Sequence, residues 1–127
     1  MRPPWGRITA IDLKTGEHLW MVPNGDTPEY VAERLNLPPE SIPNTGRQSR
    51  ANLLVTKTLL FAGEGQAGSP NLWILNKGTG ERIARLDLPG TTSGLPMTYM
   101  HEGKQYVVFS VSTEEDGAEI VALALPN

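Results

Sequence analysis

The chain has 127 residues, of which 39% are apolar and 20% charged, and it contains no cysteine. This is enough for one globular domain, and it excludes disulfide and thiolate–metal scaffolds. The formal net charge is −3, and the charges are scattered, so the chain lacks the basic face on which nucleic-acid binding depends. No apolar run approaches the ~20 residues of a membrane-spanning helix, and residues 1–5 contain no signal-like apolar segment. The 13 glycines and 11 prolines are spread along the chain, which is typical of many turns between short strands.

The first predicted element is a strand, a tight turn and a second strand over residues 8–20. A weaker copy follows at residues 72–84, and residues 120–125 match its first strand alone. Asp12 and Asn76 can each accept hydrogen bonds from the backbone of their turn, and Gly16 and Gly80 can adopt the positive φ that such a turn requires. The two copies therefore predict repeated hairpins.

An insertion at residues 26–43 separates the first hairpin from the rest of the chain. It predicts one short helix that ends before the prolines at 38 and 39. We expect Thr27 to be its N-cap, Pro28 its first residue, and Tyr30, Val31 and Leu35 to form its apolar side. Without this insertion the repeat has a period of about 46 to 48 residues, close to that of a propeller blade.

The remaining strands complete this unit. Residues 53–56, 59–62, 72–75 and 82–86 predict one blade, and residues 97–100, 105–111 and 119–125 most of another, with a hairpin turn at 101–104. The sequence thus predicts an all-β fold, a partial β-propeller of about two to three four-stranded antiparallel blades with one short helix in the insertion. Because a propeller usually needs four to eight blades, we expect the exposed edges and faces to be covered by further blades of a parent chain or by self-association.

Other motifs favour structural roles. Gly63-Glu64-Gly65-Gln66-Ala67-Gly68 fits a dinucleotide-binding pattern, but a strand rather than a helix follows it, which favours a loop between strands. His18 and His101 each lie in a hairpin without a second ligand nearby, which favours solvated turns over zinc. The acidic residues at 114–116 favour a solvated loop over a calcium site. The aromatic residues of the strands are expected in the core: Trp20, Phe61, Trp73 and Phe109.

The pattern Ala10-x-Asp12-x-x-Thr15-Gly16-Glu17-x-x-Trp20 resembles the tryptophan docking motif of the pyrroloquinoline-quinone (PQQ) dependent dehydrogenases, in which the tryptophan joins one blade to the next. The resemblance continues in order through residues 3–12, 53–63, 95–100, 103–108 and 122–126. These segments together resemble the C-terminal portion of a quinoprotein glucose or alcohol dehydrogenase.

The resemblance implies an eight-bladed propeller that holds PQQ and a calcium ion, with an acidic general base beside the quinone. It places the base and the calcium ligands in earlier blades, so it gives this chain no catalytic residue and no metal ligand. Residues 1–127 are then expected to be C-terminal blades of a periplasmic enzyme that oxidises a sugar or alcohol by hydride transfer to the quinone, and to be inactive alone. The alternatives are a non-catalytic propeller of PQQ-like repeats that acts as a protein-interaction scaffold, and a stand-alone module that closes a ring by oligomerising.

Four loops are expected on the face of the propeller that binds the cofactor: residues 43–52, 63–71, 87–96 and 112–118. Arg50 is the cation well placed among them to bind a carboxylate of PQQ through two parallel hydrogen bonds. Asn52, Thr92 and Ser93 are expected to add neutral hydrogen bonds. The alternative for Arg50 is a solvated loop residue.

Overall fold

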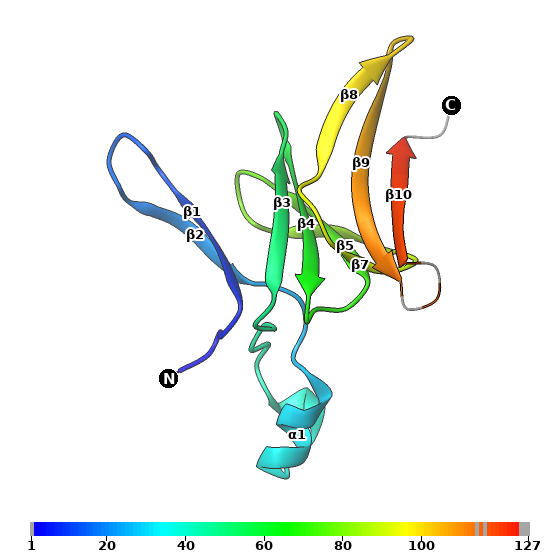
Figure 1. The fold of residues 1–127 in the computed structure, drawn as a ribbon. Coiled ribbons are helices and arrows are strands. Elements are labelled where there is room, and N and C mark those ends of the chain that lie inside the picture. The colour runs from blue at the N-terminus through cyan, green and yellow to red at the C-terminus, as the bar shows by residue number, and fades with distance from the viewer. Residues whose placement is uncertain (1, 114, 116, 125–127) are drawn as a thin grey trace.

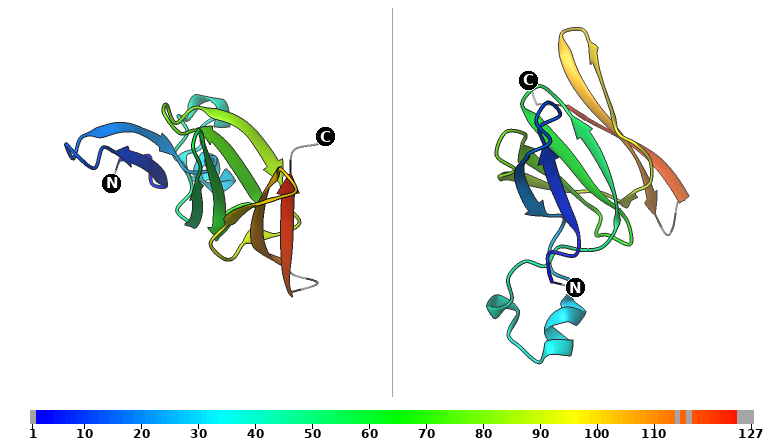
Figure 2. Two further views of the ribbon diagram at one scale, coloured as in Figure 1. Left: turned by 90° about the horizontal axis from the view of Figure 1, so that it is seen from above. Right: turned by 90° about the vertical axis from the view of Figure 1, so that its left-hand side faces the viewer.

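The computed structural model describes residues 2–113, 115 and 117–124 and contains three antiparallel sheets in succession (Figures 1 and 2). The first sheet is a hairpin of two strands, β1 (Arg7–Ile11) and β2 (His18–Pro23). The second has four strands in chain order, β3 (Arg50–Val55), β4 (Leu59–Gln66), β5 (Asn71–Asn76) and β6 (Arg82–Asp87). The third contains β7 (Thr91–Thr92), β8 (Met97–His101), β9 (Lys104–Thr113) and β10 (Gly117–Ala124). The prediction of an all-β partial propeller is confirmed.

The third sheet has an interrupted first strand. β7 pairs with Val111 and Ser112 of β9, and β8 pairs with residues 104–108 of the same strand. Between them, the amide of Ser93 still donates to the carbonyl of Ser110 at 2.9 Å. Since Pro96 has no N–H to donate, the pairing resumes only at Met97. The sequence predicted β8 but not the two-residue strand β7.

The two repeated hairpins have the same turn. The Asp12 carboxylate accepts hydrogen bonds from the amides of Lys14 and Thr15, and the Asn76 side chain accepts the equivalent bonds from Gly78 and Thr79. Gly16 has φ +76° and Gly80 φ +75°. The predicted turn is therefore confirmed in both copies.

The central sheet is covered on both faces, because successive side chains of a strand point in opposite directions. Towards the β1–β2 hairpin, it packs Leu60, Ala62, Trp73 and Leu75 against Ile8, Trp20 and Val22. Towards the third sheet, Phe61 and Leu72 pack with Leu88, Val107, Phe109 and Val111. The predicted core positions of Phe61, Trp73 and Phe109 are confirmed. The outer faces of the flanking sheets remain apolar and exposed, as at Leu19 and Ile120.

Trp20 joins the first sheet to the second. Its Nε1 donates a hydrogen bond to the carbonyl oxygen of Lys77 at 3.0 Å. Its ring lies over Gly80, where an added Cβ would be 2.6 Å from Cε3 of the indole. This confirms the docking of Trp20 between neighbouring sheets.

The insertion contains the short helix α1 (Glu29–Leu35) and the 3-10 turn η1 (Pro39–Ser41). The predicted cap is wrong, because Pro28 occupies the N-cap and the Thr27 hydroxyl instead accepts a hydrogen bond from the amide of Thr45 at 3.0 Å. The predicted apolar side is also only partly correct. Val31 is 3% exposed, whereas Tyr30 and Leu35 are about half exposed. A helix of only two turns buries little more than one side chain against the rest of the protein. No helix in the described part of the chain is long and apolar enough to cross a membrane.

The remaining motifs lie in hairpins. The motif at residues 63–68 is followed by strand β5 rather than a helix, as predicted, but the predicted loop is only partly correct: residues 63–66 end strand β4, and only Ala67 and Gly68 lie in the turn that leads into β5. His18 and His101 are exposed at strand ends, and Glu102 and Gly103 form the turn predicted at 101–104, both with positive φ. Of the predicted acidic loop, Glu114 and Asp116 lie outside the described residues.

Candidate functional site

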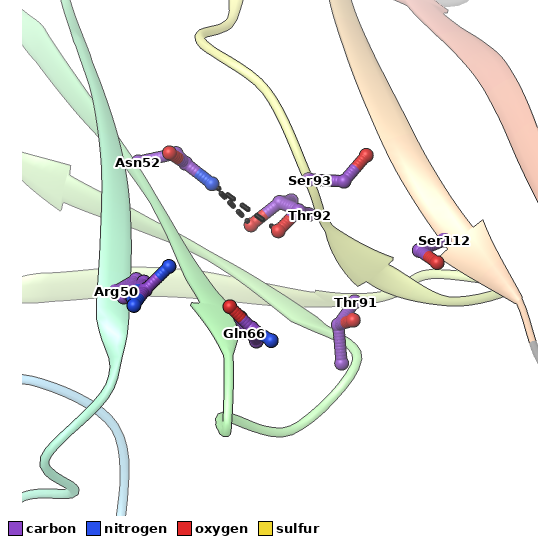
Figure 3. Close-up of a pocket in the computed structure, with 7 residues that line it drawn as sticks. All are labelled: Arg50, Asn52, Gln66, Thr91, Thr92, Ser93 and Ser112. Carbon is purple, nitrogen blue, oxygen red and sulfur yellow. Dashed lines mark hydrogen bonds between the residues drawn. The ribbon is translucent and has the colours of Figure 1, made fainter.

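A polar pocket of about 360 Å³ lies between the second and third sheets (Figure 3). Each of the four predicted loops contributes to it: β3 at its start, β4 at its end, β7 with the residue that follows, and the end of β9. The lining residues are Arg50, Asn52, Gln66, Thr91, Thr92, Ser93 and Ser112. The structure therefore brings together all four residues singled out in the sequence. Whether they bind a cofactor remains a prediction.

Asn52 and Thr92 bind each other across the two sheets. The Asn52 amide Nδ2 donates to the carbonyl oxygen and to the hydroxyl of Thr92, both at 3.2 Å, as Figure 3 shows. Thr92 is 2% exposed. A Cβ at Gly63 would lie 2.5 Å from the Thr92 hydroxyl, so a glycine is required for this close approach. The pair forms the floor of the pocket and joins the second sheet to the third.

Arg50 and Ser93 are the exposed members of the predicted set. Within the part of the chain that the structure describes, the Arg50 guanidinium has no ion pair and no hydrogen bond, and it is the one charged side chain among the lining residues. A guanidinium can bind a carboxylate through two parallel hydrogen bonds. The pocket thus combines one available cation with hydroxyl and amide groups, a donor set that fits a polar ligand bearing carboxylates.

A β-bulge in β4 adds Gln66 to the pocket. Asn52 pairs with Gly63 and Arg50 pairs with Gln66, so both Glu64 and Gly65 lie opposite Ala51. Gly65 has φ +71°, the left-handed conformation typical of such a bulge. Without the extra residue, strand alternation would point Gln66 to the same face as Ala62, away from the pocket. Gln66 was not among the predicted site residues, although two glycines inside a strand signal a bulge.

Comparison with known proteins identifies the family of the chain. The family model described as the PQQ glucose/ethanol/alcohol dehydrogenase, beta-propeller domain, matches residues 1–107. The chain belongs to this family. The family resemblance predicted from the docking motif is thereby confirmed.

Curated relatives cover almost the whole of this propeller chain. The quinoprotein glucose dehydrogenase of Escherichia coli (strain K12) is 36% identical over 99% of it, and the glycerol dehydrogenase large subunit of Gluconobacter thailandicus is 33% identical over 99%. The quinate/shikimate dehydrogenase (quinone) of Acinetobacter baylyi is 32% identical over 98%. The chain spans 16% of the E. coli and A. baylyi proteins and 17% of the G. thailandicus protein.

Proposed function

We propose that this chain supplies C-terminal blades of a PQQ-dependent dehydrogenase that oxidises a sugar or alcohol, and that its polar pocket is part of the wall of the cofactor site. The observation that carries the proposal is the convergence of four chain segments on one polar pocket, in which Arg50 has no partner among the residues that the structure describes. The sugar, polyol and hydroxy-acid dehydrogenases among the relatives support the same class of reaction.

Each candidate residue has a distinct role in this proposal. Arg50 binds a carboxylate of PQQ, and the Ser93 hydroxyl and the Asn52 carbonyl oxygen add neutral hydrogen bonds. Thr92 acts through Asn52, because its buried hydroxyl accepts a hydrogen bond from the Asn52 amide and so fixes the orientation of that amide. PQQ, when bound, accepts the hydride removed from the substrate. The general base and the ligands of a calcium ion lie in blades outside this chain.

The exposed outer faces support the placement of this chain in a larger ring. Large apolar residues such as Leu19 and Met21 on β2, and Ile120 on β10, lie on faces that no other sheet of the described residues covers. Burial of apolar surface is the main force that joins packed sheets, so neighbouring blades of the parent chain are the proposed cover. A periplasmic location, which the family resemblance implies, belongs to the same proposal.

The test uses the full-length protein that contains this chain. We expect it to bind PQQ at equilibrium and to oxidise sugars or polyols. Arg50→Ala should weaken PQQ binding at least tenfold, about 1.4 kcal/mol, through loss of the carboxylate contact. The matched control is Lys57→Ala, which removes a cation just beyond the other end of β3 and should leave the dissociation constant unchanged.

Two results would contradict the proposal. An unchanged PQQ dissociation constant in Arg50→Ala would leave the pocket with a structural role alone. A full-length protein that binds no PQQ and oxidises none of these substrates would favour the scaffold propeller, and a closed ring of several copies of the 127-residue chain would favour the stand-alone module.

A further inference from the structure

A buried carboxylate lies directly behind the pocket, on the opposite face of β4. Glu64 is 1% exposed and is one of the two residues of the bulge that turns Gln66 towards Arg50. A buried charge is costly unless hydrogen bonds compensate it. The proposed function gives this residue no role.

Both carboxylate oxygens of Glu64 accept hydrogen bonds from N–H donors. Oε2 accepts from the backbone amide of Ser69 at 2.8 Å, and Oε1 accepts from the indole Nε1 of Trp73 at 2.9 Å. The side-chain amide of Asn71 also lies 3.5 Å from Oε1. A glutamine could satisfy one of the two close donors, but its NH₂ group would then face the other. The site therefore requires a carboxylate.

Glu64 also contacts the segment that leaves the first sheet. A Cβ at Gly25 would lie 2.9 Å from the Glu64 carboxyl group. The carbonyl of Gly25 accepts hydrogen bonds from Arg82 at 2.5 Å and from Asn44 at 3.1 Å. The Arg82 guanidinium lies 3.9 Å from the centre of the Trp73 ring and pairs with Asp26 at 2.7 Å. The Glu64 carboxylate thus binds donors in and before β5 and packs against the segment that follows β2.

These contacts hold the backbone on both sides of Gln66. Glu64 precedes Gln66 by two residues and binds the amide of Ser69 three residues after it, so it closes the turn from which the Gln66 side chain projects. We propose that Glu64 is a positioning residue that acts through the β4 bulge and places the Gln66 amide beside Arg50 as a further contact to PQQ. This inference rests on the proposed function.

The test compares Glu64→Gln, Gln66→Ala and the double variant in the full-length protein, with PQQ binding measured by equilibrium dialysis. Each single change should weaken binding by a similar factor, about three- to tenfold. Because both changes remove the same contact, the double variant should bind PQQ no more weakly than the single variant with the higher dissociation constant. Glu81→Gln, on the exposed β5–β6 turn, is the control and should leave binding unchanged.

Hydrogen exchange provides a readout without cofactor. The amide of Ser69 should exchange faster in Glu64→Ala, which leaves this amide no side-chain acceptor, than in the unsubstituted protein. In Gln66→Ala it should exchange at the same rate as in the unsubstituted protein. Unchanged exchange of Ser69 would overturn the positioning role. If the PQQ dissociation constant of the double variant rises by the product of the two single factors, Glu64 does not act through Gln66, and the inference is overturned.

Gln66→Ala keeps the inference testable if Glu64→Gln does not fold, because Gln66 is exposed and its truncation leaves the core intact. Unchanged PQQ binding in that variant would overturn the inference alone, with the proposed function still standing. An unsubstituted full-length protein that binds no PQQ would overturn both.

Discussion

The turns at residues 12–17 and 76–81 share one set of hydrogen bonds and have very different surroundings. In both, a side-chain oxygen accepts from two backbone amides and a left-handed glycine closes the turn. Gly16 has no heavy atom within 4 Å of the position that a Cβ would take, whereas Gly80 lies under the ring of Trp20. The local sequence therefore determines the turn itself, and the neighbouring sheet determines whether a tryptophan docks on it.

The two copies also differ eight residues after the acceptor side chain. The first has Trp20 and the second has the exposed Ala84 at the same repeat position. The contact between the second and third sheets therefore uses core residues such as Phe61, Leu72 and Phe109 rather than a docked tryptophan.

The largest effect is expected from Trp20→Ala, which removes the docked ring. We expect a loss of roughly 3 kcal/mol in unfolding free energy, at the lower end for buried aromatic residues, because Trp20 keeps part of its surface exposed. Trp20→Phe keeps a ring but loses the bond to Lys77 and should cost about 1 kcal/mol. Urea unfolding of the full-length protein measures both. If Trp20→Ala and Trp20→Phe lower the unfolding free energy by equally small amounts, Trp20 contributes little to the contact between the sheets.

The paired changes Gly80→Ala and Gly16→Ala measure the docking against a matched turn. Both residues have positive φ, so each substitution carries a backbone cost of about 1 kcal/mol. Gly80→Ala should cost about 1 kcal/mol more, at the lower end for overpacking, because its Cβ overlaps the indole of Trp20 and the partly exposed ring can shift.

The same pair in a Trp20→Ala background sharpens the comparison. With the indole gone, the excess cost of Gly80→Ala should disappear, and the two glycine substitutions should become equal. If Gly80→Ala still costs more unfolding free energy than Gly16→Ala in this background, the extra cost does not come from the contact with Trp20.

The smallest effect is expected from Asn76→Asp, which gives the second turn the acceptor of the first. Since Asp12 accepts the same two backbone amides, the unfolding free energy should change by less than about 0.5 kcal/mol. Asn76→Ala removes the acceptor and should cost about 1 kcal/mol. If Asn76→Asp is as damaging as Asn76→Ala, the two turns are not equivalent.

Features set by neighbouring residues in the sequence could be predicted, and features set by another sheet were missed or misplaced. The turns depend on residues four apart, and the sequence predicted them correctly. The Thr27 cap failed because its hydroxyl binds Thr45, eighteen residues away. In the pocket, the meeting of the four chain segments followed from the propeller topology, although most of their lining residues lie in strands rather than in the predicted loops. The burial of Thr92 depends on a contact with Gly63 of another sheet. Gln66 was missed because its direction is reversed by one extra residue in β4.

The structure of the full-length protein with PQQ bound tests the central claim most directly. The account predicts a PQQ carboxylate within about 2.7 to 2.9 Å of the Arg50 guanidinium nitrogens, in the pocket floored by Asn52 and Thr92. PQQ bound elsewhere in the protein, with Arg50 in contact with solvent alone, would contradict it.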